Sequence, residues 1–491
     1  MSGRGADGRF KAIIVGAGVS GLTLAHAFDK AGIDYVVLDK RPVAPAWGAS
    51  ISIFPNGSRL LDQLGLYDLM NTKHTEMQYF HCRGSDGKTY CSAPFLKEVS
   101  DSAGYMGMTI ERRIFLQTLY DELPDKSKAV EHARVSEIIE DQNRVKVVLA
   151  DGIVHEGDIV IGCDGAHSAV REIMWERAHR LSPGLITADE KQKMKATYTC
   201  LIGIAPYQNG LGSNILSTVS NDKFSFLFLT QPEKIFFIVP IKMKDGQMSQ
   251  YSNRMRFTDE DVETQANKLL DYRISDTLVF GDIWKTRIRG QLVSLEEGIL
   301  SQWSFGRIVL CGDATHKVTP NAGLEGNMAM ESSAVLANEL VAAVNLHPNK
   351  KPSDEEIRLA FKKYHEIRTP RVKELFDISW MLTRLQAYDG WRFYIIQRCL
   401  LPFIFMQVAK QIATAMSGAP VLSFVPFSQR SGKVEWKKQA WELEKKIKSQ
   451  SGSGITSSNG LIASIASTAL LAYTATVWYF GRALRDPVTT A

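Results

Sequence analysis

The chain has 491 residues, enough for two or three domains, and its hydrophobic fraction of 45% can fill their cores. A charged fraction of 23% is ordinary for a globular protein and excludes wholesale disorder. The net charge of +5 is a small excess of dispersed Lys and Arg, so we expect no nucleic-acid partner.

The six cysteines form no CxxC pair, and no histidine cluster stands at metal-ligand spacing. We therefore expect buried thiols in a reducing compartment and no bound metal. The N-terminal residues 1–5 are polar and glycine-rich and predict no secretory signal, which places the body of the protein in the cytosol.

A dinucleotide-binding pattern stands near the start of the chain. Ala12–Val15 is a short apolar run that predicts a buried parallel strand, and it leads directly into Gly16-Ala-Gly-Val-Ser-Gly21. Gly16 permits a tight turn, Gly18 lets the backbone approach a pyrophosphate, and Gly21 lets the next helix pack closely. A second strand ends at Asp39, whose carboxylate can bind ribose hydroxyls and would repel a 2′-phosphate. The pattern predicts FAD or NAD rather than NADP.

The middle of the chain adds a second motif and then changes character. A buried strand leads into Asp164-Gly165, and a short helix begins near Ser168. Later segments rich in β-branched and aromatic residues predict strands at 198–204, 224–230 and 235–241. A helix with Thr258 as its N-cap is predicted to run to about Leu270. Five rings of these strands either line an apolar pocket or pack in a core, and the core is the expected outcome for most of them: Phe224, Phe226, Phe228, Phe236 and Phe237.

A third motif follows. A strand from Gly306 ends at Gly312-Asp313, and a glycine-punctuated loop then opens a long helix that runs through Leu340. Beyond about residue 385, residues 391–427 contain apolar runs that Pro402 and Pro420 are expected to interrupt, with scattered basic residues between them. That mixture predicts an interfacial helical segment, not a membrane span.

The tail predicts a membrane anchor. A charged helix over 434–448 is either a solvated surface helix or a contact with an anionic membrane. Residues 451–460 form a Ser/Gly-rich linker. Leu461–Phe480 carries no charge and is long enough to cross a bilayer core of about 30 Å, although its Ser and Thr residues leave a buried soluble helix as the alternative. The lysines before it place the body of the protein in the cytosol, and we expect the membrane of the endoplasmic reticulum.

The three motifs in this order resemble the group A flavoprotein monooxygenases, the para-hydroxybenzoate hydroxylase-like family, over roughly residues 10–345. The resemblance implies FAD as cofactor and NAD(P)H as co-substrate. It also implies an α/β fold, in which a Rossmann-type FAD-binding domain carries an inserted mixed β-sheet substrate domain. With the C-terminal segments, the expected organisation is FAD-binding parts at 1–190 and 291–385, a substrate domain at 191–290, a helical membrane-associated region at 386–450, the linker at 451–460 and one transmembrane helix at 461–481.

The resemblance carries cofactor contacts onto this chain. Asp313 matches the aspartate that contacts the ribityl chain, and Asp164 lies in the segment that touches FAD and has been linked to NAD(P)H. Residues 320–327 match the loop against the flavin pyrimidine ring. Arg112 matches an arginine that contacts the cofactor, with Arg113 as the alternative. The full expected cofactor-binding set is Gly16, Gly18, Gly21, Asp39, Gly48, Ser52, Arg112, Asp164, Asp313 and Gly326. No catalytic residue is assigned, and His167 and His316 are expected only to bond their own loops.

A narrower resemblance is to the fungal monooxygenases that epoxidise prenyl chains in meroterpenoid and indole-diterpene pathways. It is carried by Gly48–Ile51, Pro55–Gly57, Leu61–Leu66 and Ala314–Asn321. Glu325 departs from that pattern, because a glycine is common at its position. A carboxylate aimed at the flavin pyrimidine would oppose negative charge on reduced flavin, whereas one aimed outward would matter little.

The resemblance implies an oxygenase that uses NAD(P)H and O2 to epoxidise the terminal olefin of a lipophilic farnesyl- or geranylgeranyl-bearing aromatic, with a separate terpene cyclase opening the epoxide. Most of this chemistry belongs to the cofactor, so no nucleophile triad is expected. Hydroxylation of an aromatic ring is the main alternative. A non-catalytic prenyl-binding protein, comparable to the Rab GDP-dissociation inhibitors, is a remote one, because cargo binding does not require the glycine–aspartate motifs.

Overall fold

A computed structural model describes residues 9–45, 48–141, 144–244, 249–250, 255–347, 351–426, 430 and 432–437. All of them belong to one unit, Met1–Lys437. The predicted linker 451–460 and transmembrane helix 461–481 lie outside the described residues, as does most of the predicted helix 434–448. The described start of that last segment, residues 434–437, is not helical. Instead, the Trp436 indole donates a hydrogen bond to the carbonyl oxygen of Ala103 at 2.9 Å.

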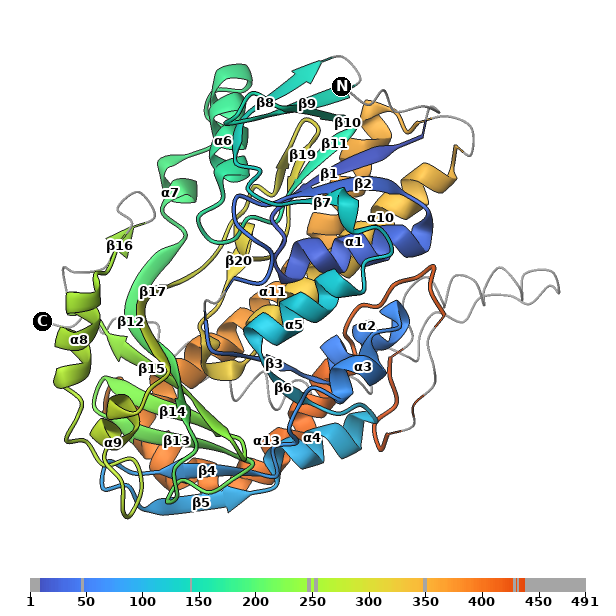
Figure 1. Ribbon diagram of the computed structural model, residues 1–491. Helices are drawn as coiled ribbons and strands as arrows, with labels where there is room; N and C mark the ends of the chain where they lie inside the picture. Colours follow the sequence, from blue (N-terminus) through green and yellow to red (C-terminus); the bar gives the residue numbers. More distant parts are fainter. Residues whose placement is uncertain are drawn as a thin grey trace, which may run out of the picture. The chain divides into compact units, whose positions relative to one another are not determined.

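The short apolar runs of the sequence form a six-stranded sheet (Figure 1). Its order is β18 (Ser304–Phe305), β19 (Ile308–Leu310), β11 (Ile159–Gly162), β1 (Lys11–Val15), β2 (Asp34–Leu38) and β7 (Ala129–Val130). All strands except β18 run parallel, and β1, β11 and β19 lie side by side. This arrangement confirms the predicted Rossmann-type sheet, whose strands read as continuous apolar runs because both faces are covered.

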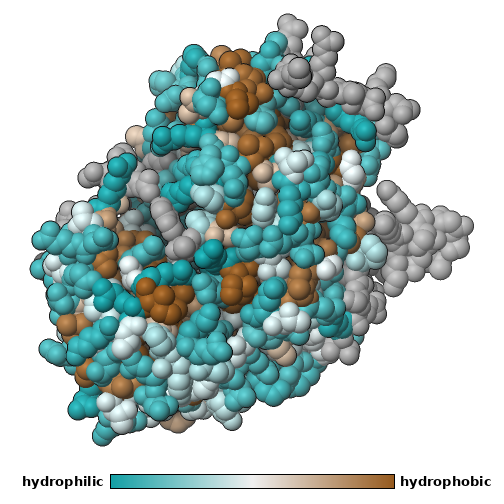
Figure 2. Space-filling view, in the orientation of Figure 1, coloured by the Kyte–Doolittle hydropathy of each residue, from teal (hydrophilic) through white to brown (hydrophobic). Residues whose placement is uncertain are grey.

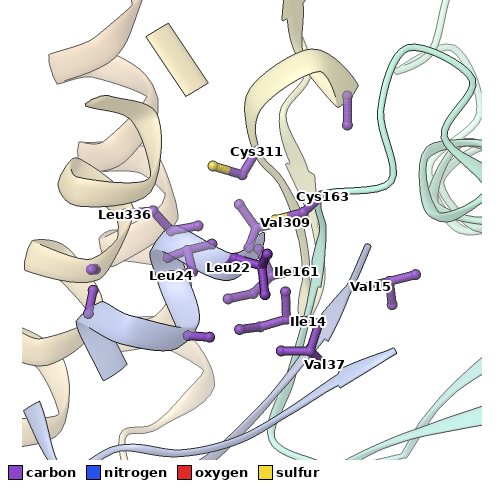
Figure 3. Close-up of a cluster of buried hydrophobic side chains, with 14 of the residues drawn as sticks. Ile14, Val15, Leu22, Leu24, Val37, Ile161, Cys163, Val309, Cys311 and Leu336 are labelled. Atoms are coloured by element: carbon purple, nitrogen blue, oxygen red, sulfur yellow. The ribbon is translucent and has the colours of Figure 1, made fainter. Parts of the chain in front are cut away.

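Helices cover this sheet and bury its side chains. The helices α1 (Val19–Ala31) and α10 (Glu325–Asn345) pack together, and α11 (Asp354–Gln386) packs on α10. Figure 3 shows the core that the strands form with α1 and α10: Ile14, Val37, Ile161, Val309, Leu22, Leu24 and Leu336. Each fully buried aliphatic side chain of this kind contributes about 1.5–3 kcal/mol relative to exposure.

Two glycines of the first motif, Gly16 and Gly21, are required by close backbone packing. Gly16 has φ +108°, and a Cβ there would lie 2.5 Å from the carbonyl oxygen of Cys163. A Cβ on Gly21 would lie 1.9 Å from the carbonyl oxygen of Gly16, so any side chain would push α1 away from β1. The helix ends at Gly32, which adopts the left-handed conformation typical of a helix C-terminus.

Smaller elements complete this half of the molecule. A three-stranded antiparallel sheet contains β8 (Val135–Asp141), β9 (Arg144–Leu149) and β10 (Val154–Gly157). The helix α6 (Ala169–Leu181) packs against β8, and the short α7 (Ala188–Lys191) follows it. The turn η1 (Lys126–Lys128) leads into β7.

A nine-stranded mixed sheet forms the second layer. Its path is β20 (His316–Lys317), β17 (Arg289–Ile299), β12 (Lys195–Pro206), β15 (Lys234–Lys242), β14 (Phe224–Thr230), β13 (Ile215–Asn221), β4 (Tyr79–Arg83) and β5 (Thr89–Ala93), with β16 (Ser249–Gln250) beside β12. The three strands expected in this region are present. The sheet also takes β4, β5, β20 and all but the first two residues of β17 from outside 191–290. The helix α8 (Asp259–Asn267) has the expected Thr258 cap but ends before Leu270, and α9 (Phe280–Lys285) follows.

The five phenylalanines of this sheet belong to cores. Phe226, Phe228 and Phe237 pack with Phe280 and Trp284 of α9 on the side away from the Rossmann-type half. Because successive strand residues point to opposite faces, Leu227 and Leu229 face the other way. The aliphatic residues, rather than the aromatic ones, therefore face the cavity described below.

The elements between the two large sheets hold them together. The strands β3 (Ser50–Ile53) and β6 (Met108–Glu111) pair antiparallel. Around them lie α2 (Pro55–Leu64), α3 (Tyr67–Asn71), α4 (Phe95–Ala103) and α5 (Arg112–Asp121). The turns η2 (Gly312–Ala314) and η3 (Pro320–Ala322) carry the chain from β19 to α10.

The last described helices run continuously from Trp391 to Met416. The helix α12 (Trp391–Ile395) passes through one π-helical turn, Ile396–Leu400, into α13 (Leu401–Met416). The sequence predicted a break at Pro402, but this proline occupies the first turn of α13, where its missing N–H costs little. Among the described residues, 391–416 is the one helical stretch long and apolar enough to cross a membrane by length and composition.

A buried carboxylate fixes α10 to α11. Glu331 of α10 is fully buried and accepts hydrogen bonds from Arg368 at 2.8 Å and from Arg371 at 2.7 and 2.8 Å. The amide of Asn56 in α2 donates a further bond at 2.7 Å. Burial alone would raise the pKa of Glu331, but the two arginines outweigh it and hold the pKa at about 2. The cluster therefore carries a compensated charge in the core.

We predict that Glu331→Gln destabilises the fold by about 3–5 kcal/mol, because it leaves the buried Arg368 without its carboxylate. Since the folded pKa of Glu331 lies below the ordinary 4.5, its contribution is present at neutral pH and lost as the pH falls from 4.5 towards 2. Urea unfolding followed by tryptophan fluorescence measures the change. The control Glu366→Gln, an exposed residue of α11, should shift stability by less than about 1 kcal/mol. Equal effects of the two variants would contradict the assigned role.

Candidate active site

A cavity of about 340 Å³ opens where the carboxyl ends of β1, β11 and β19 meet. Because the segments that follow parallel strands gather at this edge, three motifs far apart in the sequence line one cavity. They contribute Gly18, Val19, Ser20, Cys163, Gly165 and Asp313. The cavity thus lies at the edge where open α/β sheets bind their ligands.

The wall of the cavity formed by β13, β14 and β15 of the large sheet, by β6 and by α4 is aliphatic apart from Thr109 of β6. It presents Met77, Leu96, Met108, Leu216, Leu227, Leu229 and Ile238. The titratable side chains among the described lining residues are Arg112, Cys163, Asp313, Lys317 and Glu325. Arg112 stands at the start of α5, and Cys163 and Asp313 stand at the edge of the parallel sheet. Lys317 lies in β20 at the end of the large sheet, and Glu325 is the first residue of α10. None belongs to the aliphatic wall.

The glycine loop leaves room for a ligand at the start of α1. Gly18 is the N-cap of α1 and provides no side-chain hydrogen bond to the first turn. A Cβ built on Gly18 would meet nothing within 4 Å. The space beside Gly18, in front of the backbone N–H groups of the first turn of α1, is therefore open. Free N–H groups and the positive end of the helix dipole suit an anionic group such as a pyrophosphate.

Asp39 supports the same loop. Its carboxylate accepts hydrogen bonds from the backbone N–H of Ala17 at 2.7 Å and of Arg41 at 2.8 Å. The carboxylate is therefore held beside the glycine loop at the end of β2. Asp39 does not itself line the cavity, so its contact with a ribose stays a prediction.

Asp164 has its partners at the start of α6. Its carboxylate accepts hydrogen bonds from the Ser168 hydroxyl at 2.5 Å and from the N–H of Ala169 at 2.7 Å. Burial raises the pKa of Asp164, and these hydrogen bonds oppose that rise. The neighbours Cys163 and Gly165 line the cavity, whereas the carboxylate caps a helix. A cofactor contact of Asp164 therefore stays a prediction.

A charged trio occupies the loop before α10. The ammonium group of Lys317 lies 2.8 Å from Asp313 and 2.7 Å from Glu325, the first residue of α10. Burial raises the pKa of Glu325, and Lys317 opposes that rise; the pKa of Lys317, which burial alone would lower, is raised by the two carboxylates. Glu325 does line the cavity, but the charge that departed from the family pattern is paired. Lys317 belongs to the Ala314–Asn321 motif, but the sequence gives no reason to pair it with Glu325, eight positions further on.

The remaining predicted residues divide by position. Arg112, Ser52 and Gly326 line the cavity, while Gly48, Gly16 and Gly21 do not. Arg113 is exposed, so Arg112 is the one of the two candidate arginines that reaches the cavity. Gly48 has φ +79°, and a Cβ there would lie 3.1 Å from the Arg112 side chain. Gly48 thus leaves the space in which Arg112 lies.

Asn327, to which the sequence assigned no separate role, clamps the cavity floor. Its side-chain amide donates to the carbonyl oxygens of Ser52 and Gly323, both at 2.9 Å, and its oxygen accepts from the N–H of Phe54 at 2.8 Å. These bonds tie β3, the turn η3 and α10 together. An asparagine two residues into an amphipathic helix gives no signal of such a role, because its partners are 275 and 273 positions away.

The two motif histidines point elsewhere. His316 is buried, contacts the hydroxyl of Ser332 at 2.8 Å and packs against Trp303. Burial lowers the pKa of His316 to about 3, so the ring is neutral. His167 lies 3.4 Å from Glu296. Neither histidine lines the cavity.

Comparison with known proteins agrees with this geometry. A family model described as a FAD binding domain matches residues 9–180 and 210–379. FAD-dependent monooxygenase DEP2 of Alternaria brassicicola is 47% identical over 434 residues, covering 88% of this chain and 82% of that protein. FAD-dependent monooxygenase penE of Penicillium thymicola is 34% identical, covering 87% and 90% respectively. The chain belongs to the FAD-dependent monooxygenases of group A.

Solved structures share the fold of this monooxygenase. Klebsiella pneumoniae HpxO complexed with FAD and uric acid superimposes with a TM-score of 0.68 at 20% identity, over 84% of this chain and 98% of that one. A salicylate hydroxylase substrate complex gives a TM-score of 0.61 at 16% identity, over 85% and 100%. At these identities the likeness establishes the fold.

FAD is the cofactor of this monooxygenase, and the residues at the cavity fit it. The uncapped start of α1 and the open space before Gly18 suit a pyrophosphate. Asp313 offers an acceptor for hydroxyl groups, and Arg112 and Lys317 place positive charge within the lining. At η3 and the start of α10, Gly323 and Gly326 line the cavity and leave the backbone there open to a ligand.

We predict that Gly18→Ala weakens FAD binding at least about tenfold, a loss of about 1.4 kcal/mol, because its methyl group fills the space before the first N–H groups of α1. The variant's apoprotein should unfold within about 1 kcal/mol of wild type, since φ at Gly18 is −84° and the methyl meets no protein atom. Fluorescence titration of the apoprotein with FAD measures the affinity. The control Gly418→Ala, which makes ordinary contacts far from the glycine loop, should bind FAD normally. Unchanged affinity in Gly18→Ala would contradict the assigned pyrophosphate position.

Proposed function

We propose that this monooxygenase epoxidises the terminal olefin of a farnesyl- or geranylgeranyl-substituted aromatic, with NAD(P)H as the electron donor and O2 as the oxygen source. The observation that carries the proposal is the aliphatic wall of the cavity, which has no titratable side chain among its described residues. An isoprenoid chain matches such a wall in polarity. A terminal olefin also needs no proton removed before it is oxygenated, whereas a phenol must be deprotonated to activate its ring.

The protein's own part in this reaction is binding, orientation and exclusion of water. When bound, FAD supplies the chemistry, because it accepts two electrons from the nicotinamide and activates O2. Leu227, Leu229 and Ile238 would hold the chain so that its terminal double bond reaches the flavin side of the cavity. The same side chains keep water from the reaction, which would otherwise release hydrogen peroxide.

The cofactor roles of individual residues are part of the proposal. Gly18 and the start of α1 would receive the pyrophosphate, and Asp39 the adenosine ribose. Asp313 would contact the ribityl chain, and the segment of Asp164 would face FAD and NAD(P)H. Lys317, paired with Glu325, would lie at the pyrimidine end and leave no uncompensated negative charge there.

The cellular setting is also proposed. The uncharged residues 461–480 would anchor the chain in the endoplasmic reticulum membrane, with the body in the cytosol. A lipophilic aromatic would be available there from the bilayer. The product epoxide is a substrate for acid-initiated ring closure, so a separate terpene cyclase would act next in a fungal meroterpenoid route. The fungal origin of the relatives named above supports this setting.

We predict that a farnesylated aromatic stimulates NADPH oxidation by the purified yellow protein at least about tenfold, because bound substrate is what commits the reduced cofactor to oxygenation. Mass spectrometry should find one added oxygen, in an epoxide that opens to a diol in acid.

The matched control is the same aromatic with a fully saturated chain, which keeps the ring but has no olefin. It should bind without gaining oxygen. Oxygen added to the ring of either compound would instead establish an aromatic hydroxylase. Failure of both compounds to stimulate oxidation would overturn the assigned substrate class.

A further inference from the structure

The first half of the helical segment 391–416 exposes large hydrophobic side chains. We call this the α12–α13 apolar face, and six residues form it: Trp391, Tyr394, Ile395, Leu400, Phe403 and Ile404. Their exposed fractions run from 42% to 88%, with Phe403 the most exposed. Soluble proteins seldom gather that many large apolar groups on one short stretch. On the face of the molecule shown in Figure 2, by contrast, hydrophobic residues form separate groups among hydrophilic ones.

The opposite side of this helix packs against the rest of the protein. Phe405 lies with its ring centroid 4.7 Å from Phe95 of α4 and 5.2 Å from Phe80 of β4. Ala409 and Met416 continue the same buried cluster. Upstream, Gln397 bonds the hydroxyl of Tyr90 at 3.2 Å. These contacts fix the rotation of the helix about its axis, and they leave its apolar face exposed to solvent.

Apolarity changes along the helix axis. The exposed residues of its second half are polar, among them Gln407, Lys410 and Thr414. Residues 391–404 cover a length of about 21 Å at 1.5 Å per residue. A partner helix or a second copy would favour an even apolar stripe along the whole segment. An apolar half with Trp391 and Tyr394 at one end, and Arg392 beside them, is the pattern of a helix that enters a bilayer surface.

The same cluster connects the helix to the active-site cavity. Leu96 and Leu216 line the cavity, and both also pack in the cluster that contains Leu401, Met406 and Phe405. The helices α4 and α13 lie directly against each other (Figure 1). An unbroken apolar layer thus leads from the outward face of the helix, between α4 and α13, to the aliphatic wall.

We propose that the α12–α13 apolar face inserts into the leaflet of a lipid bilayer that faces the body of the protein. A lipophilic substrate then enters the cavity from the bilayer between α4 and α13. The surface assignment stands on the helix alone. The entry route rests on the proposed function, because it presumes a substrate dissolved in the membrane.

A native cysteine allows the full chain to be tested. Cys399 is exposed on this segment, whereas Cys82, Cys163, Cys200 and Cys311 are buried and Cys91 is partly buried. The protein is placed in phosphatidylcholine nanodiscs and labelled at Cys399 with a polarity-sensitive fluorophore. Lipids that carry a nitroxide high on the acyl chain then quench any label that lies among the acyl chains.

Three variants in a Cys399→Ser background move the label. Phe403→Cys places it on the apolar face, Lys410→Cys on the polar half of the same helix, and Glu260→Cys on the exposed surface of α8. We expect lipid quenching at 399 and 403 to exceed that at 410 and 260 at least about twofold. Equal quenching at all four positions would overturn the proposal. So would disulfide cross-linking of Cys399 between two copies, which would identify a second chain as the occupant. In lipid-free buffer, shielding of Cys399 from aqueous iodide that disappears when residues 455–491 are deleted would identify the chain's own tail instead.

Negative charges introduced on the apolar face test the entry route. Phe403→Glu/Ile404→Glu should raise KM about tenfold for a farnesylated aromatic dissolved in the nanodisc, and leave kcat unchanged, because delivery rather than chemistry is altered. Gln407→Glu/Thr414→Glu adds the same charge to the polar half and should change neither constant. An equal effect of both pairs would overturn the route. Lipid quenching does not depend on turnover. A protein that inserts into the bilayer but oxidises no prenyl chain would therefore contradict the proposed function and still support the membrane contact of this face.

Discussion

The buried carboxylate of Glu331 sets the position of the helix on which the active site depends. Arg368 and Arg371 of α11 and Asn56 of α2 all bond it, so three elements meet at one point in the middle of α10. A carboxylate can be buried here only because both charges and hydrogen bonds compensate it. One turn earlier, Asn327 bonds β3 and η3. The first turn of α10, with Glu325 and Gly326, is thereby held rigidly at the cavity.

This anchoring separates the cavity into two chemical surfaces. The charged groups of Asp313, Lys317 and Glu325 pair with one another near the start of α10. Strands β13, β14 and β15 contribute aliphatic residues, because Phe226, Phe228 and Phe237 point away into the core with α9. Phe236 packs with Leu229 in a separate buried cluster. In the proposed function, the first surface holds the cofactor and the second holds an apolar acceptor. The proposed substrate class rests on which face of β14 and β15 is turned to the cavity.

Much of the parallel sheet could be predicted from the sequence, because glycine spacing and apolar runs are local signals. Gly16, Gly18 and Gly21 carried a specific steric requirement, and each short strand was bounded by its motif. Arg112 could be told from Arg113 only as the first residue of a helix. The roles of Lys317, Asn327 and Glu331 were out of reach, since their partners come from other elements. Glu331 is one of three glutamates in α10, so its charge alone did not mark it as buried.

Two further outcomes had physical causes that the sequence does not expose. Phe226 and Phe228 were candidates for the pocket, but the alternation of strand residues turned Leu227 and Leu229 to it instead. Pro402 suggested a break, yet a proline in the first turn of α13 is compatible with a helix that continues from α12 through a π-helical turn. Which face of a strand is turned to the cavity, and whether a helix continues past a proline, both depend on the elements that pack against them. The sequence of the segment alone does not reveal these elements.

The central claim is that the substrate side of the cavity supplies no acid or base to the reaction. The most direct test is the single-turnover rate of product formation from pre-reduced protein, substrate and O2, measured between about pH 6 and pH 9. Our account predicts a rate that varies by less than about twofold, because an olefin needs no proton removed. A rate that rises about tenfold per pH unit before levelling off would reveal a base on the substrate or in the aliphatic wall, and would contradict it.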